Sequence, residues 1–195
     1  MKAYLHFRNC LLCLLIALPF GSAMADAEDT AKYSETIKIF QDAGASGGFF
    51  DNSYGYAVFP TIGKGGFVVG GAHGKGRVYA TGKHTGDTTM SQLSVGFQMG
   101  AQGYSQIIFF EDKRAYDEFT SGNFEFSADA TAVAITAGAS ASAGSTGSSA
   151  GASGGKKDAT TTGSYHKGMA TFTVAKGGLM YEAVLAGQKF SYKGL

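Results

Sequence analysis

Small residues recur at every second position between residues 67 and 80. Because successive side chains of a β-strand point to opposite faces, this spacing predicts a strand with one face made of small residues. Such a face lets another layer of the protein approach closely. The opposite face carries His73, Lys75 and Arg77, so a row of side chains that can be positively charged is expected there. The members of the small face are Val68, Gly70, Ala72, Gly74, Gly76, Val78 and Ala80.

Several other segments also have the character of strands. The segment Tyr54–Pro60 predicts a strand that Pro60 ends, and residues 61–66 are then expected to form a turn. Strict alternation of apolar and polar residues over Gln92–Gln102 is typical of a half-buried strand. The apolar run Gln106–Phe110 predicts a fully buried, central strand. Further strands are expected at 170–174 and 179–186.

Two helices complete the expected fold. Tyr33, Ile37 and Phe40 recur at three- and four-residue spacing, which predicts a helix over 26–43 that Gly44 stops. A second helix is expected over 111–119, and residues 131–136 fit either a strand or a short helix. These elements predict the α+β class: one β-dominated domain, with an antiparallel sheet of about six or seven strands, curved or sandwich-like, and two helices.

The N-terminal segment has the three zones of a secretory signal peptide. Lys2 and Arg8 provide a positively charged start, and residues 10–20 form an apolar run too short to span a membrane. The small residues Ala23 and Ala25 then predict cleavage after Ala25. We therefore expect residues 1–25 to be a signal peptide. The mature chain is expected in the bacterial periplasm, with the outer membrane as a candidate surface for peripheral association.

Cleavage would change the composition of the chain in two ways. Both cysteines, Cys10 and Cys13, would leave, so no disulfide or thiolate chemistry is expected. Loss of Lys2 and Arg8 lowers Lys plus Arg from 16 to 14 against 15 acidic residues, so no global basic field favours nucleic acid. The remaining residues, 26–195, suit one domain, interrupted by an Ala-, Gly-, Ser- and Thr-rich segment at 137–163 that we expect to be flexible.

Catalytic motifs are not indicated. Lys64, Lys75 and Lys83 each follow a glycine but lack the spacing of a phosphate-binding Walker sequence. The histidines of the mature chain, at 73, 84 and 166, have no helical or short spacing to carboxylates that would suggest a metal site. The prediction is a protein that is not an enzyme, with no catalytic residue, no metal and no cofactor.

The glycine-rich region resembles a known family. Residues 55–79, GYAVFPTIGKGGFVVGGAHGKGRVY, are similar to the SYLF domain, and the similarity continues through Ser94–Phe110, Ala175–Ala183 and Gly187–Phe190. The resemblance implies association with membrane phospholipids, phosphoinositides in eukaryotic members, and no known enzymatic activity. In eukaryotic members a basic amphipathic segment before the domain helps docking, whereas the corresponding residues here, 26–32, are acidic.

The candidate binding residues form three groups. Two Lys-Gly-Gly segments, Lys64-Gly65-Gly66 and Lys176-Gly177-Gly178, each precede an expected strand. Their successive amide groups and lysines suit a phosphate, although the same sequence also suits a turn with a solvated lysine. The third group is the row of His73, Lys75 and Arg77, which suits an anionic surface or a strand edge protected by charge.

These observations favour a non-enzymatic, phospholipid- or membrane-binding module of the bacterial cell envelope. The alternatives are a small outer-membrane β-barrel and a structural envelope protein that binds a protein partner. The expected partner is a phospholipid or membrane surface, not nucleic acid.

Overall fold

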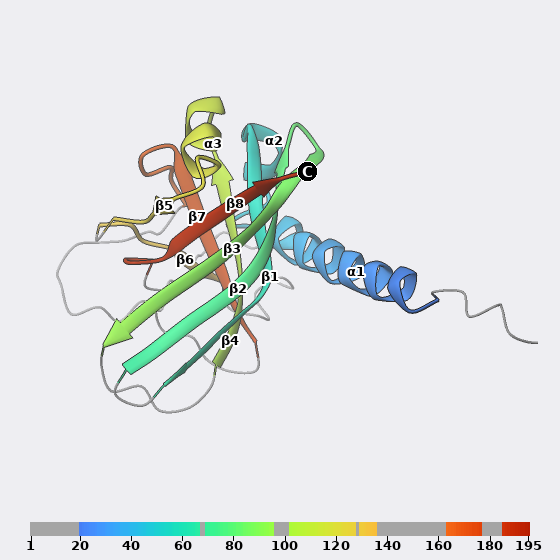
Figure 1. The fold of residues 1–195 in the computed structure, drawn as a ribbon. Coiled ribbons are helices and arrows are strands. Elements are labelled where there is room, and N and C mark those ends of the chain that lie inside the picture. Colours follow the sequence, from blue (N-terminus) through green and yellow to red (C-terminus); the bar gives the residue numbers. More distant parts are fainter. Residues whose placement is uncertain (1–19, 67–68, 96–101, 128, 136–162, 177–184) are drawn as a thin grey trace, which may run out of the picture. The chain divides into compact units, whose positions relative to one another are not determined.

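The computed structural model describes residues 20–66, 69–95, 102–127, 129–135, 163–176 and 185–195 (Figure 1). The chain divides into two compact units, 1–31 and 32–195. Of the first unit, the described part is the beginning of helix α1 (Phe20–Asp42). The predicted cleavage site after Ala25 lies within α1, which begins before the expected helix start at Asp26. Most of the segment 137–163 lies outside the described residues.

The second unit is a β-dominated α+β domain built on one mixed sheet of eight strands, in the order β5-β8-β3-β2-β1-β4-β7-β6. All neighbours are antiparallel except β6 and β7, which are parallel. The fold class is therefore as predicted, with slightly more strands than expected. The elements are α2 (Phe49–Asn52), β1 (Gly55–Gly66), β2 (Val69–Ala80), β3 (Lys83–Val95), β4 (Gln102–Phe110), α3 (Lys113–Phe119), β5 (Phe124–Glu125), β6 (Val133–Ile135), β7 (Met169–Lys176) and β8 (Lys189–Gly194).

Strand β1 does not end at Pro60, so the predicted turn over 61–66 is wrong. The strand continues to Gly66, and its register shifts between Val58 and Thr61 against β2, which marks a β-bulge. Proline has no N–H to donate to a neighbouring strand, and a bulge is a place in a sheet where none is needed. The carbonyl of Pro60 accepts a hydrogen bond from the Ser105 hydroxyl at 2.8 Å. The bulge also exchanges the two faces of β1 for every residue that follows it.

The small-residue face of β2 is confirmed in the described part of that strand. It lies on the face that we call inner, where the residues at 70, 72, 74, 76, 78 and 80 are all buried. A Cβ added to Gly74 would lie 2.6 Å from Ile62 Cγ1, and one added to Gly76 would lie 2.6 Å from the Phe59 ring. Large side chains of the neighbouring strand therefore fill the space that these glycines leave.

The inner face carries the main hydrophobic core. This core joins residues from both ends of the sheet, since Phe190 of β8 and Met169 of β7 belong to one cluster. Phe190 also contacts Phe59 of β1 and Phe119 of α3, at ring-centroid distances of 5.7 and 5.1 Å. The sheet must curl to bring these elements together. Strand β4 is central, as predicted, and its residues from Tyr104 to Phe110 are all buried.

The opposite, outer face is covered over only part of its area. Tyr33 and Phe40 of α1 are buried in a second cluster with Val58 of β1 and Phe172 of β7. Phe49 of α2 adds a ring 5.4 Å from that of Phe109. This aromatic packing covers the end of the sheet where β1 begins. Beyond the bulge of β1, the outer face is exposed at Thr61, Gly63 and Gly65.

One further segment differs from the sequence expectation, and another that fitted two structures is now assigned to one of them. The alternating segment Gln92–Gln102 is divided between β3 and β4, with residues 96–101 outside the described part. In β3 the apolar Leu93 is 84% exposed, whereas Gln92 is buried and donates from Nε2 to the carbonyl of Ala186 at 2.9 Å. The ambiguous segment 131–136 contains a strand, β6, and not a helix.

The predicted helix at 111–119 is present as α3. The Asp112 side chain caps it by accepting a hydrogen bond from the amide of Ala115 at 2.8 Å. Its buried residues are Ala115 and Phe119, and Gly122 beyond it has a φ of +98°. Figure 1 shows α3 close to the end of β4, and Ala115 and Phe119 join the inner core there.

Candidate functional site

Three of the predicted site residues with ionisable side chains share the exposed part of the outer face. His73 pairs with Gly63 of β1, Gly63 pairs with Gly103 of β4, and Gly103 pairs with Lys176 of β7. Directly paired residues point to the same face of a sheet, so His73 and Lys176 stand on one row with two glycines between them. The same row continues on the other side of His73 through Ser91 of β3 to Lys189 of β8. We call the face around His73, Lys75, Lys176 and Lys189 the outer basic surface.

Lys75 belongs to the neighbouring row of the same face. It pairs with Thr61, and the ammonium of Lys176 donates a hydrogen bond to Thr61 Oγ1 at 2.9 Å. Lys176 therefore reaches across β4 toward the strand that stands beside Lys75. Within the described residues, Lys75 has no hydrogen-bond or ion-pair partner, and its side chain is exposed. Two ammonium groups can thus approach the same bound anion.

Glycines form the floor of this surface. Gly63, Gly65, Gly71 and Gly103 lie in strands without a positive φ, and Cβ atoms added at Gly63 or Gly65 would meet nothing within 4 Å. No close contact within the described residues therefore requires glycine at these two positions. Glycine inside a strand costs conformational entropy relative to alanine, and it is typical of places where a ligand or another backbone approaches closely.

The rim of the surface carries one carboxylate and one apolar side chain. Glu125 of β5 is paired with Lys189, at 3.5 Å between Oε2 and Nζ. Leu93 extends from β3 opposite Gly71 and is 84% exposed. The surface thus combines lysines, a histidine, glycine backbone without side chains, a carboxylate at the rim and an exposed leucine.

Of the remaining predicted residues, Gly65 belongs to the glycine floor described above, and the others lie elsewhere. Lys64 pairs with Ala72, so it stands on the inner side of the sheet and is half-buried. Gly65 and Gly66 pair with Gly71 and Gly70 in the antiparallel ladder. The Lys64-Gly65-Gly66 segment is therefore strand and not the expected turn. Gly177 and Gly178 lie outside the described residues.

Arg77 is on the outer face but at the border of its covered part. Its guanidinium carbon lies 4.3 Å from the centroid of the Tyr33 ring of α1, which is a cation–π contact. Opposite it, Asp87 of β3 is the paired residue. The arginine therefore packs against the aromatic cover, and the row of three cations predicted on β2 is divided between two environments.

Sequence reasoning missed three features of the surface. Thr61 was expected in a turn, and its position beside Lys75 follows from the bulge at Pro60. Lys189 was not singled out, because its row depends on the pairing of β3 with β8. The exposure of Leu93 reverses the expected inward side of its alternation.

Two other kinds of site are absent from the described residues. None of their His, Cys, Asp and Glu side chains form a group of three or more that could hold a metal ion. None of the described helices is both long and apolar enough to pass through a bilayer.

Comparison with a family model identifies the family of this chain. The model, Ysc84, is described as "Las17-binding protein actin regulator" and matches residues 91–191, from β3 to β8. The chain belongs to this SYLF family. The resemblance noted in the glycine-rich segment is therefore confirmed. The SYLF match includes Lys176 and Lys189 of the outer basic surface, whereas Lys75 and His73 lie before it.

One curated relative of this SYLF chain is Beta cell expansion factor A of Aeromonas veronii. The two are 29% identical over 168 residues, which are 84% of this chain and 55% of the relative. The chain thus spans about half the length of that protein.

Proposed function

We propose that this SYLF chain is an exported, non-enzymatic module that binds phospholipid at a membrane surface of the bacterial cell envelope. The observation that carries the proposal is the outer basic surface. His73, Lys75 and Lys176 face the same side of the sheet over a floor of glycines. The predicted signal peptide supports the location, and the family supports a lipid as the ligand.

The proposed contact with a lipid headgroup uses both the lysines and the glycine floor of the outer basic surface. A cation near an anionic membrane surface contributes about 1 kcal/mol, so two lysines supply a useful affinity although the mature chain as a whole is slightly acidic. The glycine floor allows a headgroup to come close to the sheet, and the lysines flank it. Leu93, exposed at the rim, is placed to enter the interface with the acyl chains.

The ionic part of this mechanism has a defined salt dependence. Exposed charges interact over a Debye length of about 10 Å at 0.1 M salt, and this range shortens as salt is added. Binding that rests on the outer basic surface should therefore weaken at high ionic strength. Binding through apolar insertion alone would not.

Vesicle co-sedimentation tests the proposal. The protein without residues 1–25 is mixed with vesicles of zwitterionic lipid, and with the same vesicles containing an anionic phospholipid. We expect the protein to pellet with the anionic vesicles and to be released by salt. Equally negligible pelleting with both vesicle types would contradict the proposal.

A protein partner is the second candidate function. The description of the matching family names binding to Las17, a protein, and this supports a partner-binding role for the present chain as well. Crosslinking in cells followed by identification of the attached chain distinguishes the two functions. A single protein recovered at the outer basic surface, with no vesicle binding, would favour the partner.

A further inference from the structure

A separate pocket lies where the two ends of the curled sheet approach each other. Its cavity of about 180 Å³ is lined by residues of β5 and β7, which stand near opposite ends of the strand order. The segment that joins β5 to β6 adds Ser127 and Ala130. This pocket lies on the inner side of the sheet, and of its lining residues Glu125 is also at the rim of the outer basic surface, where it is paired with Lys189.

The floor of the pocket is apolar. Phe126, Met169 and Leu185 line it and are 7%, 5% and 1% exposed. Apolar cavities of about 150 Å³ are large enough to hold a benzene ring. The floor therefore suits a branched or aromatic group of similar size.

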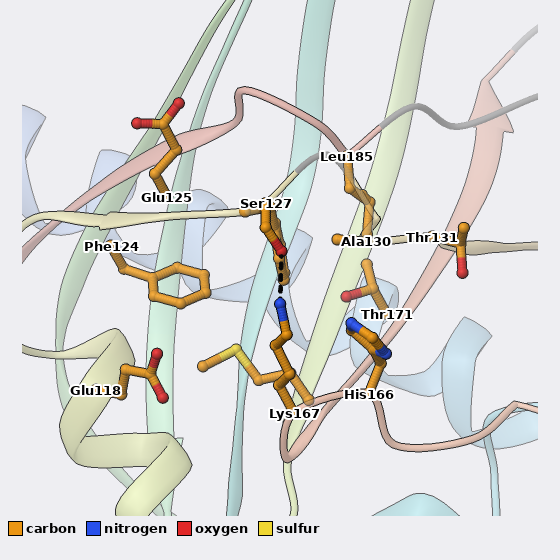
Figure 2. Close-up of a pocket in the computed structure, with 12 residues that line it drawn as sticks. Glu118, Phe124, Glu125, Ser127, Ala130, Thr131, His166, Lys167, Thr171 and Leu185 are labelled. Carbon is orange, nitrogen blue, oxygen red and sulfur yellow. Dashed lines mark hydrogen bonds between the residues drawn. The ribbon is translucent and has the colours of Figure 1, made fainter.

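One wall of the mouth carries a lysine whose donors are only partly used. Lys167 Nζ donates to Ser127 Oγ at 3.1 Å and to Asp129 Oδ1 at 3.4 Å. Nζ also lies 3.3 Å from Asp129 Oδ2, so both carboxylate oxygens share the side of the ammonium that faces Asp129. An ammonium has three donors, and the side turned away from Ser127 and Asp129 is open to an anionic group of a ligand. Figure 2 shows the Lys167 ammonium directed at the Ser127 side chain.

The neighbouring serine, histidine and aspartate do not form a catalytic triad. The Ser127 hydroxyl donates to the Asp129 carboxylate, and His166 Nε2 contacts the same carboxylate at 3.0 Å. The hydrogen bond from the Ser127 hydroxyl, followed by those from the Asp129 amide, from Lys167 and from His166, holds the pKa of Asp129 well below its usual range. In a triad the serine would instead donate to the histidine. The cluster thus fixes the charged wall of a binding pocket.

The other wall carries the opposite charge. Glu118 of α3 lines the pocket and is paired with Arg114 through Oε2 at 3.4 Å, which leaves acceptor sites on its carboxylate. In Figure 2, Glu118 and the Phe124 ring lie on one side of Lys167 and His166 on the other, while the Glu125 carboxylate points away. Since each charge already has a partner of opposite sign, a ligand with no net charge is favoured.

The backbone at Lys167 is also unusual. Its φ is +54°, followed by +81° at Gly168, in a two-residue turn that pairs His166 with Met169. A lysine is a poor residue for this left-handed position, which asparagine or glycine adopts more easily. The turn between β2 and β3 has the same form, with φ values of +50° at Thr81 and +78° at Gly82. It offers a matched control.

We infer that this pocket binds a small zwitterion with an apolar body, of the chemistry of a free apolar α-amino acid. Its ammonium would contact Glu118, its carboxylate the free donor of Lys167, and its side chain the floor of Phe126, Met169 and Leu185. This inference goes beyond the proposed membrane function and does not depend on it.

Calorimetric titration of the full-length chain tests the ligand class. The probes are L-leucine, glycine, hexanoate and hexylamine. Leucine has both charges and the apolar body, whereas glycine lacks the apolar body, hexanoate lacks the ammonium and hexylamine lacks the carboxylate. We expect leucine to bind at least about tenfold more tightly than the other three, because each of these lacks one of the three contacts that the pocket offers. No leucine binding, equal binding of glycine, or equal binding of either singly charged probe would overturn the inference.

Substitutions of Lys167, in the turn before β7, and of Glu118, in α3, test the two charged walls of the pocket. Lys167→Asn and Glu118→Gln should each weaken leucine binding about tenfold, and Lys167→Arg should restore most of it. Their controls are Thr81→Asn, which also places Asn before Gly in a turn, and Asp117→Asn on the same helix as Glu118. The controls should bind leucine as the unaltered chain does. Unchanged binding by Lys167→Asn or Glu118→Gln would overturn the assignment of that wall.

Discussion

The ammonium of Lys176 lies 2.9 Å from Thr61 Oγ1, although β7 and β1 are separated in the sheet by β4. The residue of β4 that pairs with Lys176 is Gly103, which has no side chain to block the path. Lys176, from the C-terminal part of the chain, thus reaches β1 at the residue that pairs with Lys75. This crossing is what joins cations of β2 and β7 into one surface.

The crossing predicts the effect of a side chain at Gly103. Gly103→Val should leave the fold intact, because a Cβ there would lie no closer than 3.8 Å to its neighbours. Its branched side chain should displace Lys176 from Thr61 and weaken binding to anionic vesicles about fivefold, as expected for one lysine. Co-sedimentation measures the change. Ala134→Val, at an exposed position of β6, is the control and should bind as before.

The two classes of strand glycine should respond differently to alanine. Gly76→Ala should lower the free energy of unfolding by about 1–3 kcal/mol, because the added Cβ would lie 2.6 Å from the Phe59 ring and 2.8 Å from the Val58 carbonyl. Gly65→Ala meets nothing within 4 Å and should be neutral or stabilising by up to about 1 kcal/mol. Urea unfolding of the two variants measures this. Equal destabilisation would show that the floor glycines are also required for packing.

Stability should fall in alkaline solution through Tyr104. Burial raises the pKa of its phenol to about 12, although a hydrogen bond from Gln188 acts in the opposite direction. In the unfolded chain the phenol ionises near pH 10, so its contribution is intact below that pH and is lost as the pH rises toward 12. The loss should approach about 2–3 kcal/mol.

Tyr104→Phe should remove this part of the alkaline loss. Urea unfolding at pH 8, 10 and 11 measures it, with the unaltered chain as the reference. Some loss should remain in the variant, because burial also raises the pKa of Tyr56 to about 12. An identical decline in both proteins would show that the Tyr104 phenol is not shielded from water.

Local periodicity was enough to predict the principal strands. The buried run at Gln106–Phe110 and the small face of β2 follow from side-chain alternation alone, and both are present. The prediction failed at Pro60, where a missing N–H usually ends a strand. In this sheet a bulge accommodates the proline inside β1.

The candidate surface depended on features that periodicity does not contain. The bulge exchanges the faces of β1, so Lys64 stands on the inner side and Thr61 on the outer side. The approach of Lys176 to Thr61 requires the order β2-β1-β4-β7, which no local pattern specifies. The basic character of β2 was therefore predictable, but the set of lysines that meets there was not.

The most direct test of the membrane account compares two pairs of lysines by co-sedimentation with anionic vesicles. One variant carries Lys75→Gln and Lys176→Gln, and the other carries Lys83→Gln and Lys113→Gln, which remove the same charge outside the outer basic surface. The account predicts that the first pair weakens binding about tenfold or more, and the second by less than about twofold. Equal weakening by both pairs would contradict a defined binding surface.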